Sequence, residues 1–393
     1  MQPMDRRKRL VVVTTSAFVL AAAALGASHV ATSSRRSSWK LVNLGTAPGY
    51  KMADVQPYGL NDRGEVVGTL EETVNGKLSI RAFVWKNGTM TLLKNGGEAT
   101  AVNNRGTVIG TPIDTGSPSV GAVWKGSHIT GLGTLGGSWS NPLAINERDQ
   151  IVGDSVTANG QLHAFLWNAG AMTDLGTLRG TSSSSAIAIN TRGQIIGTST
   201  KPGGATRGFI WQNGRMTDLG SLFGADNRPV AISDQGVVVG TIMTRLGNPI
   251  VAFKWERGLL TNLGRFDAPA SQAQDINNQG VIIVEAMSAA GNPQSALILD
   301  HGKAIDLGSL GGGLTTFGNH LNDRNQVVGS SFTRSGGRRS FVWQRGKMTA
   351  LPTYDGVAPP WGGISQLNEL GDVTGTAYPT HHMAGVIWRS VQR

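Results

Sequence analysis

The sequence predicts an all-β protein, a β-propeller of eight four-stranded blades. Three observations support this prediction. A unit of about 44 residues recurs eight times, each unit holds four short strand patterns, and one fourth-strand pattern stands ahead of the first unit instead of after the last. Four strands in every 40–45 residues, repeated four to eight times, describe a propeller.

The repeat is most easily followed from an Asn between the first and second strand patterns of each unit. The clearest unit runs over residues 144–180. This marker residue is Asn in seven units and Ser in one, with successive markers 42 to 46 residues apart, at Asn61, Asn103, Asn146, Asn190, Ser233, Asn277, Asn322 and Asn368. So regular a period overrides the usual expectation of two or three domains for 393 residues.

The first two strands of a unit form a hairpin around the marker. The first strand ends in an aliphatic residue directly before the marker, and the second begins with a pair such as Ile151-Val152. Branched side chains of this kind favour a pleated surface. Three residues after each marker only Gly, Asp or Asn occurs, and these residues tolerate a positive φ. We therefore interpret the pattern as a tight structural turn and not as a ligand loop.

The third and fourth strands form a second hairpin. The third carries a Trp in seven units, for example Trp167, and Leu299 in the sixth. A large side chain at one register position of every unit indicates a packing layer between neighbouring sheets. The fourth strand follows a Gly-containing turn and reads M-T-D-L-G in residues 172–176. The unit is thus a four-stranded antiparallel sheet.

The last unit lacks its fourth strand. The sequence ends at Arg393, just after the third-strand residue Trp388, whereas a fourth-strand pattern occupies residues 39–45. A closed ring explains this offset, because the N-terminal strand then completes the last sheet and covers its edge. The alternative is seven blades plus an irregular cap, since the sixth unit has lost its Trp.

Residues 1–38 are predicted to be a signal peptide and a short linker, ahead of a single propeller domain over residues 39–393. A basic segment, Arg6–Arg9, precedes an apolar run, Leu10–Leu25, and small residues follow it. The run is short for a membrane span. We expect a secreted protein with no stable span after cleavage. The alternative is a protein tethered to the membrane by an uncleaved signal.

Composition argues against several classes of function. The net charge is +10, but six Arg or Lys and one Asp in residues 1–38 account for +5 of it. The remaining +5 over 355 residues is too dilute for a nucleic-acid surface. Cysteine is absent, which excludes disulfides and thiolate metal ligands. No phosphate-binding loop, G-x-S-x-G or H-E-x-x-H motif occurs. We expect no cofactor, no metal site, no nucleic-acid partner and a monomer.

Two segments of the clearest unit resemble a known repeat. The strings H-A-F-L-W-N-A-G-A-M-T-D-L-G-T-L and A-I-N-E-R-D-Q-I-V-G are similar to the HAF repeat of exported bacterial proteins, and the resemblance covers roughly residues 39–390. It implies an extracellular, propeller-like repeat protein and brings no catalytic residues. The His of the motif occurs only as His163 among eight equivalent positions, so it is an ordinary strand position here.

The first candidate site lies on the first strands. Two residues before the marker, five units have Ala or Gly, whereas units six to eight have Asp275, His320 and Gln366. Adjacent units become adjacent blades, so these side chains should lie near one another close to the axis. They form either a ligand pocket with an acid–base pair or hydrogen bonds across the blade interfaces around a wet channel.

The second candidate site is the face opposite the tight turns. The loops between strands two and three, and between units, vary in length and sequence, and binding concentrates in variable loops on a rigid scaffold. Trp139, Tyr354 and Trp361 belong to these segments. Their rings suit stacking on sugars or anchoring of peptides. The alternative is that such rings pack inward and seal the ring of blades.

The sequence therefore favours a secreted, non-enzymatic binding or scaffold protein whose variable-loop face binds an extracellular glycan or a surface protein. The alternative is an extracellular polysaccharide-active hydrolase or lyase with its site at the propeller channel. That activity requires two carboxylates, or a His and a carboxylate, converging near the axis. A structural coat protein is the third possibility.

Overall fold

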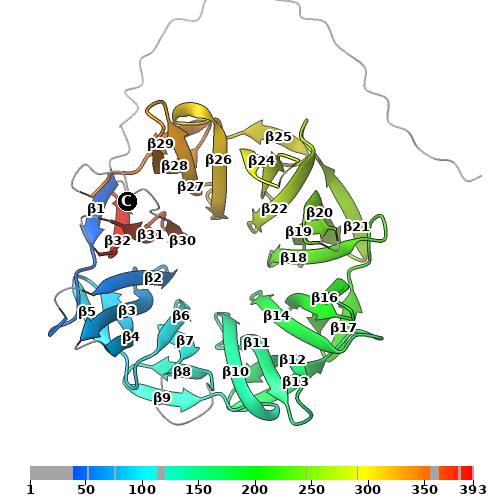
Figure 1. The fold of residues 1–393 in the computed structure, drawn as a ribbon, viewed down its shortest axis with the longest axis horizontal. Coiled ribbons are helices and arrows are strands. Elements are labelled where there is room, and N and C mark those ends of the chain that lie inside the picture. The colour runs from blue at the N-terminus through cyan, green and yellow to red at the C-terminus, as the bar shows by residue number, and fades with distance from the viewer. Residues whose placement is uncertain are drawn as a thin grey trace, which may run out of the picture. The chain divides into compact units, whose positions relative to one another are not determined.

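The computed structural model describes residues 39–50, 53–74, 77–112, 120–244, 246–289, 291–354, 363–378 and 382–391. They form eight four-stranded antiparallel sheets, arranged as the blades of a ring around a central opening (Figure 1). The prediction of an eight-bladed propeller is confirmed, and the seven-bladed alternative is wrong. The described residues contain no helix that could span a membrane. The predicted signal peptide lies outside the described residues.

Blades 1 to 7 each take four consecutive strands, from β2–β5 to β26–β29, and blade 8 consists of β30, β31, β32 and β1. The first strand of each blade lies nearest the opening (Figure 1). The first strands are β2 (Asp54–Leu60), β6 (Glu98–Val102), β10 (Gly136–Ile145), β14 (Ser183–Ile189), β18 (Asp226–Ile232), β22 (Ala270–Ile276), β26 (Gly311–Leu321) and β30 (Ile364–Leu367). The second strands are β3 (Val66–Val74), β7 (Thr107–Thr111), β11 (Ile151–Thr157), β15 (Ile195–Thr200), β19 (Val238–Met243), β23 (Ile282–Met287), β27 (Val327–Thr333) and β31 (Val373–Ala377).

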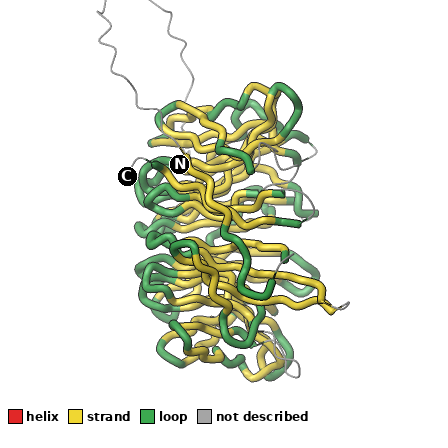
Figure 2. The backbone as a smooth tube through the Cα atoms, turned by 90° about the vertical axis from the view of Figure 1, so that its left-hand side faces the viewer, coloured by secondary structure: helices red, strands yellow, loops and turns green. Residues whose placement is uncertain are grey.

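The outer half of each blade completes the sheet. The third strands are β4 (Lys77–Lys86), β8 (Ala122–Lys125), β12 (Leu162–Asn168), β16 (Thr206–Gln212), β20 (Pro249–Glu256), β24 (Pro293–Asp300), β28 (Arg338–Gln344) and β32 (Ala384–Ser390). The fourth strands are β5 (Thr89–Leu92), β9 (His128–Gly131), β13 (Ala171–Gly176), β17 (Arg215–Asp218), β21 (Leu259–Gly264), β25 (Lys303–Asp306), β29 (Lys347–Ala350) and β1 (Trp39–Asn43). Seen from the side, loops border the strands along both faces of the ring (Figure 2).

The hairpin turns adopt the backbone that their residues predict. The third residue after the marker has a positive φ where it is Gly64 (70°) and also where it is Asp149 (59°) or Asn325 (57°). The turn from the third to the fourth strand of blade 1 is Asn87-Gly88, and both residues have positive φ. This backbone matches the twist of a two-residue hairpin. We call the face that carries these two sets of turns the turn face.

The hydrophobic core lies between blades, in eight clusters that each join two neighbours. The cluster between blades 2 and 3, for instance, packs Ile109 and Val123 against Ile151, Phe165 and Trp167. Complete burial of one such side chain stabilises the fold by about 1.5–3 kcal/mol. Because every cluster needs both of its blades, no blade has a complete core of its own.

Blade 8 closes the ring as the sequence predicts. β1 pairs antiparallel with β32 in the register Trp39↔Ser390 to Asn43↔Val386. Beyond it, Leu44 donates its backbone N–H to the carbonyl of Gly385 at 2.9 Å. Gly385 has room for no side chain, since an added Cβ would lie 2.7 Å from Cγ1 of Val55 in blade 1. Strand exchange and close packing therefore hold the same junction.

We predict that a protein lacking residues 39–45 is strongly destabilised, because blade 8 then loses its edge strand and Leu44, which is 3% exposed, leaves the core between blades 8 and 1. The loss should be at least about 4 kcal/mol of unfolding free energy, measured by denaturant unfolding. Lys40→Ala, at an exposed position of the same strand, should have little effect. An unchanged melting temperature after the deletion would contradict this account of ring closure.

Candidate functional site: the central channel

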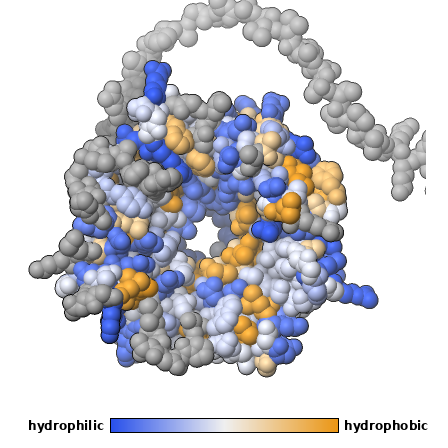
Figure 3. Space-filling model, in the orientation of Figure 1, coloured by the Kyte–Doolittle hydropathy of each residue, from blue (hydrophilic) through white to orange (hydrophobic). Residues whose placement is uncertain are grey.

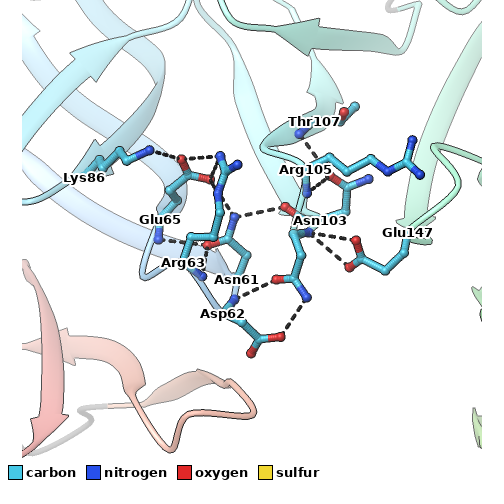
Figure 4. A network of polar contacts seen from close by, with 10 residues as sticks. Asn61, Asp62, Arg63, Glu65, Lys86, Asn103, Arg105, Thr107 and Glu147 are labelled. Carbon is cyan, nitrogen blue, oxygen red and sulfur yellow. Dashed lines mark hydrogen bonds and ion pairs between the residues drawn. The ribbon is translucent and has the colours of Figure 1, made fainter. Parts of the chain in front are cut away.

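Each of the seven marker Asn residues hydrogen-bonds both within its own turn and to the next blade. In blade 1, the Asn61 side-chain oxygen accepts the backbone N–H groups of Arg63 (3.0 Å) and Glu65 (2.9 Å), which holds the turn together. Its side-chain nitrogen donates to the backbone carbonyl of Asn103 in blade 2 at 2.9 Å (Figure 4). One amide thus shapes its own turn and ties it to the next blade.

This cross-blade bond recurs around the axis and forms what we call the asparagine belt. Seven of the eight blade junctions have it, at 2.9–3.0 Å, from Asn61 to 103, Asn103 to 146, Asn146 to 190, Asn190 to 233, Asn277 to 322, Asn322 to 368 and Asn368 to 61. The last bond joins blade 8 to blade 1. The gap is at Ser233, whose shorter side chain instead accepts the N–H of Val237 at 3.3 Å.

A second ring follows from the residues directly after the markers: Asp62, Asn104, Glu147, Thr191, Asp234, Asn278, Asp323 and Glu369. We call it the carboxylate ring, because five of its eight members are acidic. Seven backbone N–H groups donate to the side-chain oxygen of the next member at 2.7–3.0 Å. These bonds orient most of the carboxylates around the axis.

Members of the two rings from blades 3 to 8 line a cavity of about 290 Å³ at the turn-face end of the channel. Beneath the polar rings the cavity is lined by aliphatic residues, Ile145, Ile189, Ile232, Ile276 and Leu321. Burial raises the pKa of Glu369, and the charges of Asp323 and Asp62 raise it further, against the hydrogen bond from Asp323 and the charge of Arg324. The mouth of the channel is therefore a negatively charged rim above an apolar throat.

Farther along the channel, the wall is built from β-bulges. In every blade the residue three before the marker is left out of the strand pairing, at Tyr58, Thr100, Leu143, Ile187, Val230, Gln274, Asn319 and Ser365. A residue in the middle of an innermost strand is flanked by the adjacent blades and by its own second strand. Its exposed surface therefore faces the opening, as for Leu143 (39% exposed) and Val230 (38%).

The bulge residues make the channel two-sided. Blades 3 to 5 present the apolar Leu143, Ile187 and Val230. Blades 6 to 8 present the polar Gln274, Asn319 and Ser365. Figure 3 shows apolar atoms along one side of the opening and hydrophilic atoms along the other. A molecule in the channel therefore meets an aliphatic wall on one side and hydrogen-bonding groups on the other.

Asp275, His320 and Gln366 lie on three consecutive innermost strands, and their hydrogen bonds reach backbone groups rather than one another. Asp275 accepts the N–H of Leu321 in the next blade at 3.0 Å, and His320 has a hydrogen bond with the Ser365 backbone. Gln366 accepts the N–H of its own neighbour in the chain. Asp275 and His320 thus each bond to the next blade, whereas Gln366 bonds within its own blade, and both predicted roles of the three residues stay predictions.

Burial sets the protonation of the first two of these residues. It raises the pKa of Asp275 to about 7, although two backbone N–H groups favour the charged form. It lowers the pKa of His320 to about 4. The imidazole is therefore neutral at neutral pH, and the carboxyl exchanges its proton close to pH 7. No metal-binding group of three or more His, Cys, Asp or Glu exists among the residues that the structure describes.

The sequence analysis missed a second buried acid beside the polar wall. Glu285 on β23 is 2% exposed and accepts hydrogen bonds from the side chains of Gln272 (2.8 Å) and Gln274 (2.6 Å) and from the backbone N–H of Gly318. Burial raises its pKa, against these hydrogen bonds and the charge of Arg338. Its position within the otherwise apolar second strand of the sixth unit was the available signal.

The predicted aromatic residues lie elsewhere than expected. Trp139 is half-buried within β10, and its carbonyl accepts the Ser155 hydroxyl at 3.0 Å, so it belongs to a strand and not to a loop. Tyr354 packs against the core between blades 7 and 8, and its hydroxyl accepts a hydrogen bond from Asn43. Trp361 lies outside the described residues.

Comparisons with known proteins support the fold and nothing beyond it. No protein-family model and no curated protein sequence matches the chain. Similar solved structures include the β-propeller domain of the Trilobed protease from Pyrococcus furiosus, which has an open velcro topology (TM-score 0.51, 13% identity, 78% of this chain and 99% of that one). Others are a prolyl endopeptidase (0.53, 12%, 83% and 54%) and an acylaminoacyl peptidase from Pyrococcus horikoshii (0.48, 11%, 84% and 58%). The chain thus spans about half of the prolyl endopeptidase chain.

The comparison overturns the function predicted from sequence. The expected module that binds an extracellular glycan or surface protein, and its polysaccharide hydrolase or lyase alternative, are contradicted, because the similar solved structures named above include a protease propeller and a prolyl endopeptidase. Nothing found in the structure or the comparisons indicates a glycan or secretion. The HAF resemblance, the export signal and the monomeric state stay predictions, because no finding tests them.

The gap in the asparagine belt gives the first prediction from this site. Ser233→Asn should supply the missing bond to the carbonyl of Asn277 and raise the unfolding free energy by about 0.5–1.5 kcal/mol. Asn190→Ser, which copies the gap in the preceding blade, should lower it by about 1–3 kcal/mol, because the carbonyl of Ser233 loses its partner. Denaturant unfolding measures both, and a destabilised Ser233→Asn protein would contradict the proposed role of the belt.

Asp275 gives the second prediction. Its folded-state pKa of about 7 lies above the ordinary 3.8, so the folded state holds this proton more tightly than the unfolded state. The stability that it contributes is therefore complete below about pH 4 and is lost as the pH rises through 7. Between pH 4 and pH 8, the unfolding free energy of the Asp275→Asn variant should fall by roughly 1–4 kcal/mol less than that of the unsubstituted protein. His320 titrates in both proteins, so their difference isolates Asp275; parallel stability profiles would contradict the assignment.

Proposed function

We propose that the chain is a peptide-selecting propeller, whose central channel takes in an extended, cationic stretch of polypeptide and holds it for a peptidase. The observation that carries the proposal is the negatively charged rim above an apolar throat, at the end of a channel with one aliphatic and one polar wall. The propellers of similar architecture belong to proteins named as peptidases. That likeness supports a peptide as the ligand, and no catalytic residue is carried over from it.

The electrostatics of the rim favour a cation. Four carboxylates line the cavity, and burial together with the charges of Asp323 and Asp62 raises the pKa of Glu369. Walls of low dielectric constant concentrate the field of such a ring along the axis and attract charges of opposite sign. A Lys or Arg side chain entering the cavity relieves the repulsion, and its aliphatic stem fits against Ile189 and Ile232 in the throat.

The two-sided wall favours an extended chain. In an extended peptide, successive side chains point in opposite directions. At the level of the bulges, an apolar side chain of the peptide then meets Leu143, Ile187 and Val230, while the next side chain points toward the polar wall of blades 6 to 8.

We predict that a fluorescently labelled octapeptide of alternating Leu and Arg binds the protein, and that the same peptide with Glu in place of Arg does not. The double variant Asp234→Asn, Glu369→Gln should weaken binding about five- to tenfold, because two charges leave the rim while oxygens remain to accept the ring hydrogen bonds. Fluorescence anisotropy at low and at high salt measures the affinity, which should fall with ionic strength.

The matched control is Asp218→Asn, Glu256→Gln, which removes the same charge from ion pairs on β17 and β20. It should leave the affinity unchanged. If both double variants lost the same affinity, the effect would be one of net charge alone, and the proposed role of the channel would be wrong. Equal binding of the Glu peptide would overturn the peptide selectivity itself.

A further inference from the structure

Blade 5 presents apolar side chains at two loop tips on the face opposite the turn face. We call this the loop face, because the antiparallel order places there the loops from second to third strands and from each blade to the next (Figure 2). Phe223, in the loop that enters blade 5, is 72% exposed, and Leu246, in the loop from β19 to β20, is 89% exposed. The strand ends beside them, Asp226 and Met243, are paired, so both loops leave the same end of the blade.

The repeat shows that Leu246 is an exception. Blades 3 to 7 share a tight loop between their second and third strands, closed by a backbone hydrogen bond such as that from Gly247 to Thr244 at 2.9 Å. At the position of Leu246, the other described loops have the polar or small residues Asn159, Gly203 and Ser335. The shared turn therefore does not require an apolar side chain at this tip.

The turn that holds Phe223 differs from its counterparts in the same way. It is closed by a hydrogen bond from Ala225 to Leu222 at 3.1 Å, and Phe223 has a φ of 60°, an unfavourable backbone for a bulky residue. The turn between blades 5 and 6 has Phe266 at the same position, with a φ of 56°, but that ring packs against the core between the two blades. The turn between blades 3 and 4 has Arg179 there. Phe223 thus keeps the unfavourable backbone without burying its ring.

Positive charges surround this apolar pair. The loops of the loop face from the junction of blades 3 and 4 to that of blades 5 and 6 carry one exposed carboxylate among their described residues, Asp267, and three exposed cations, Arg179, Lys201 and Arg265. The side chains of the three cations make no hydrogen bond or ion pair within the described part of the chain. Asp218, at the end of β17, is paired with Arg207 at 2.6 Å. These loops therefore carry a surplus of positive charge.

Projecting apolar side chains among free cations match the chemistry of an anionic lipid surface. Apolar side chains enter the boundary between headgroups and acyl chains, and Arg and Lys are attracted to the anionic headgroups. Both features occur together on blades 4 and 5, which are neighbours in the ring (Figure 1). The acidic rim of the channel lies on the opposite face, where the negative charge of a membrane would not repel it.

We propose that the loop face of blades 4 and 5 binds the surface of an anionic lipid membrane. Phe223 and Leu246 enter the headgroup region, and the three cations contact phosphate groups around them. In this orientation the carboxylate ring and the channel mouth face the solution. The proposal concerns a different face from the channel mouth and does not depend on the function proposed for the channel.

The test uses the absence of cysteine from the chain. Leu246→Cys in the full chain carries a single nitrobenzoxadiazole dye, whose fluorescence rises when it enters lipid. Leu259→Cys, 68% exposed beside a turn of the turn face, is the matched control. Because the apolar run of residues 10–25 can itself bind lipid, the dye reports which face inserts. With phosphatidylcholine vesicles containing about 25% phosphatidylglycerol, the dye at position 246 should gain at least about twofold in fluorescence, and the dye at 259 should not change.

Variants separate the apolar and the charged contributions. In the Leu246→Cys protein, Phe223→Ser should raise the vesicle concentration for half-maximal gain about tenfold. The double variant Arg179→Gln, Lys201→Gln should do the same, whereas Lys303→Gln, Lys347→Gln, at the turn-face ends of β25 and β29, should change nothing. The gain should also fall with added salt.

Three results would overturn the proposal: equal gain at the two labelled positions, equal gain with vesicles of phosphatidylcholine alone, or no gain with either kind of vesicle. The last result would point to a protein as the partner of the apolar pair. Both labelled positions are exposed, and the melting temperature of each labelled protein and variant confirms its folding.

Discussion

The bond from a marker amide to the carbonyl of the next blade is the contact on which the rest of this molecule depends. No blade has a complete core of its own, so the blades must be held at a fixed spacing and angle for the eight clusters between them to pack. A buried amide that donates at 2.9–3.0 Å to the neighbouring turn fixes that spacing at the narrowest point of the ring. Each such bond contributes only about 1 kcal/mol net, but an unpaired carbonyl buried there costs more than that.

The lining of the channel follows from the positions of the belt residues, because their neighbours in the chain form the channel wall. The residue after each marker is carried to the axis by the same turn, so an acidic side chain at that position joins a ring of carboxylates whichever blade it belongs to. The residue before each marker is aliphatic because it packs under the belt, and this produces the throat. The bulge three residues before the marker leaves one residue per blade outside the strand pairing, and the side chain of this residue is not part of the packing between blades. Variation at that position, Leu143 against Gln274 for example, gives the channel its two sides.

The period, the hairpins and the orphan strand at Trp39 were sufficient to predict the fold, because each is a local pattern repeated eight times. The sequence also placed Asp275 and His320 on the innermost strands of neighbouring blades, but it left open whether they form a pocket or bond across the blade interface. It did not reveal the belt, since an Asn in a turn has a sufficient local explanation and its second partner lies 42 or more residues away. Trp139 was assigned to a loop because the bulged strand β10 begins earlier than the repeat suggests.

The two rings also explain how a repeat protein tolerates imperfect copies. The belt is interrupted between blades 5 and 6, where the marker is Ser233, but there the N–H of Asp234 donates to the side chain of Asn278 at 2.7 Å. The carboxylate ring is interrupted between blades 3 and 4, where Thr191 follows the marker, but there the belt bond of Asn146 is intact at 3.0 Å. Every junction keeps at least one of the two bonds. The junctions at Ser233 and Thr191 each close with one of the two bonds, and the five acids of the ring both accept ring bonds and bring negative charge to the channel mouth.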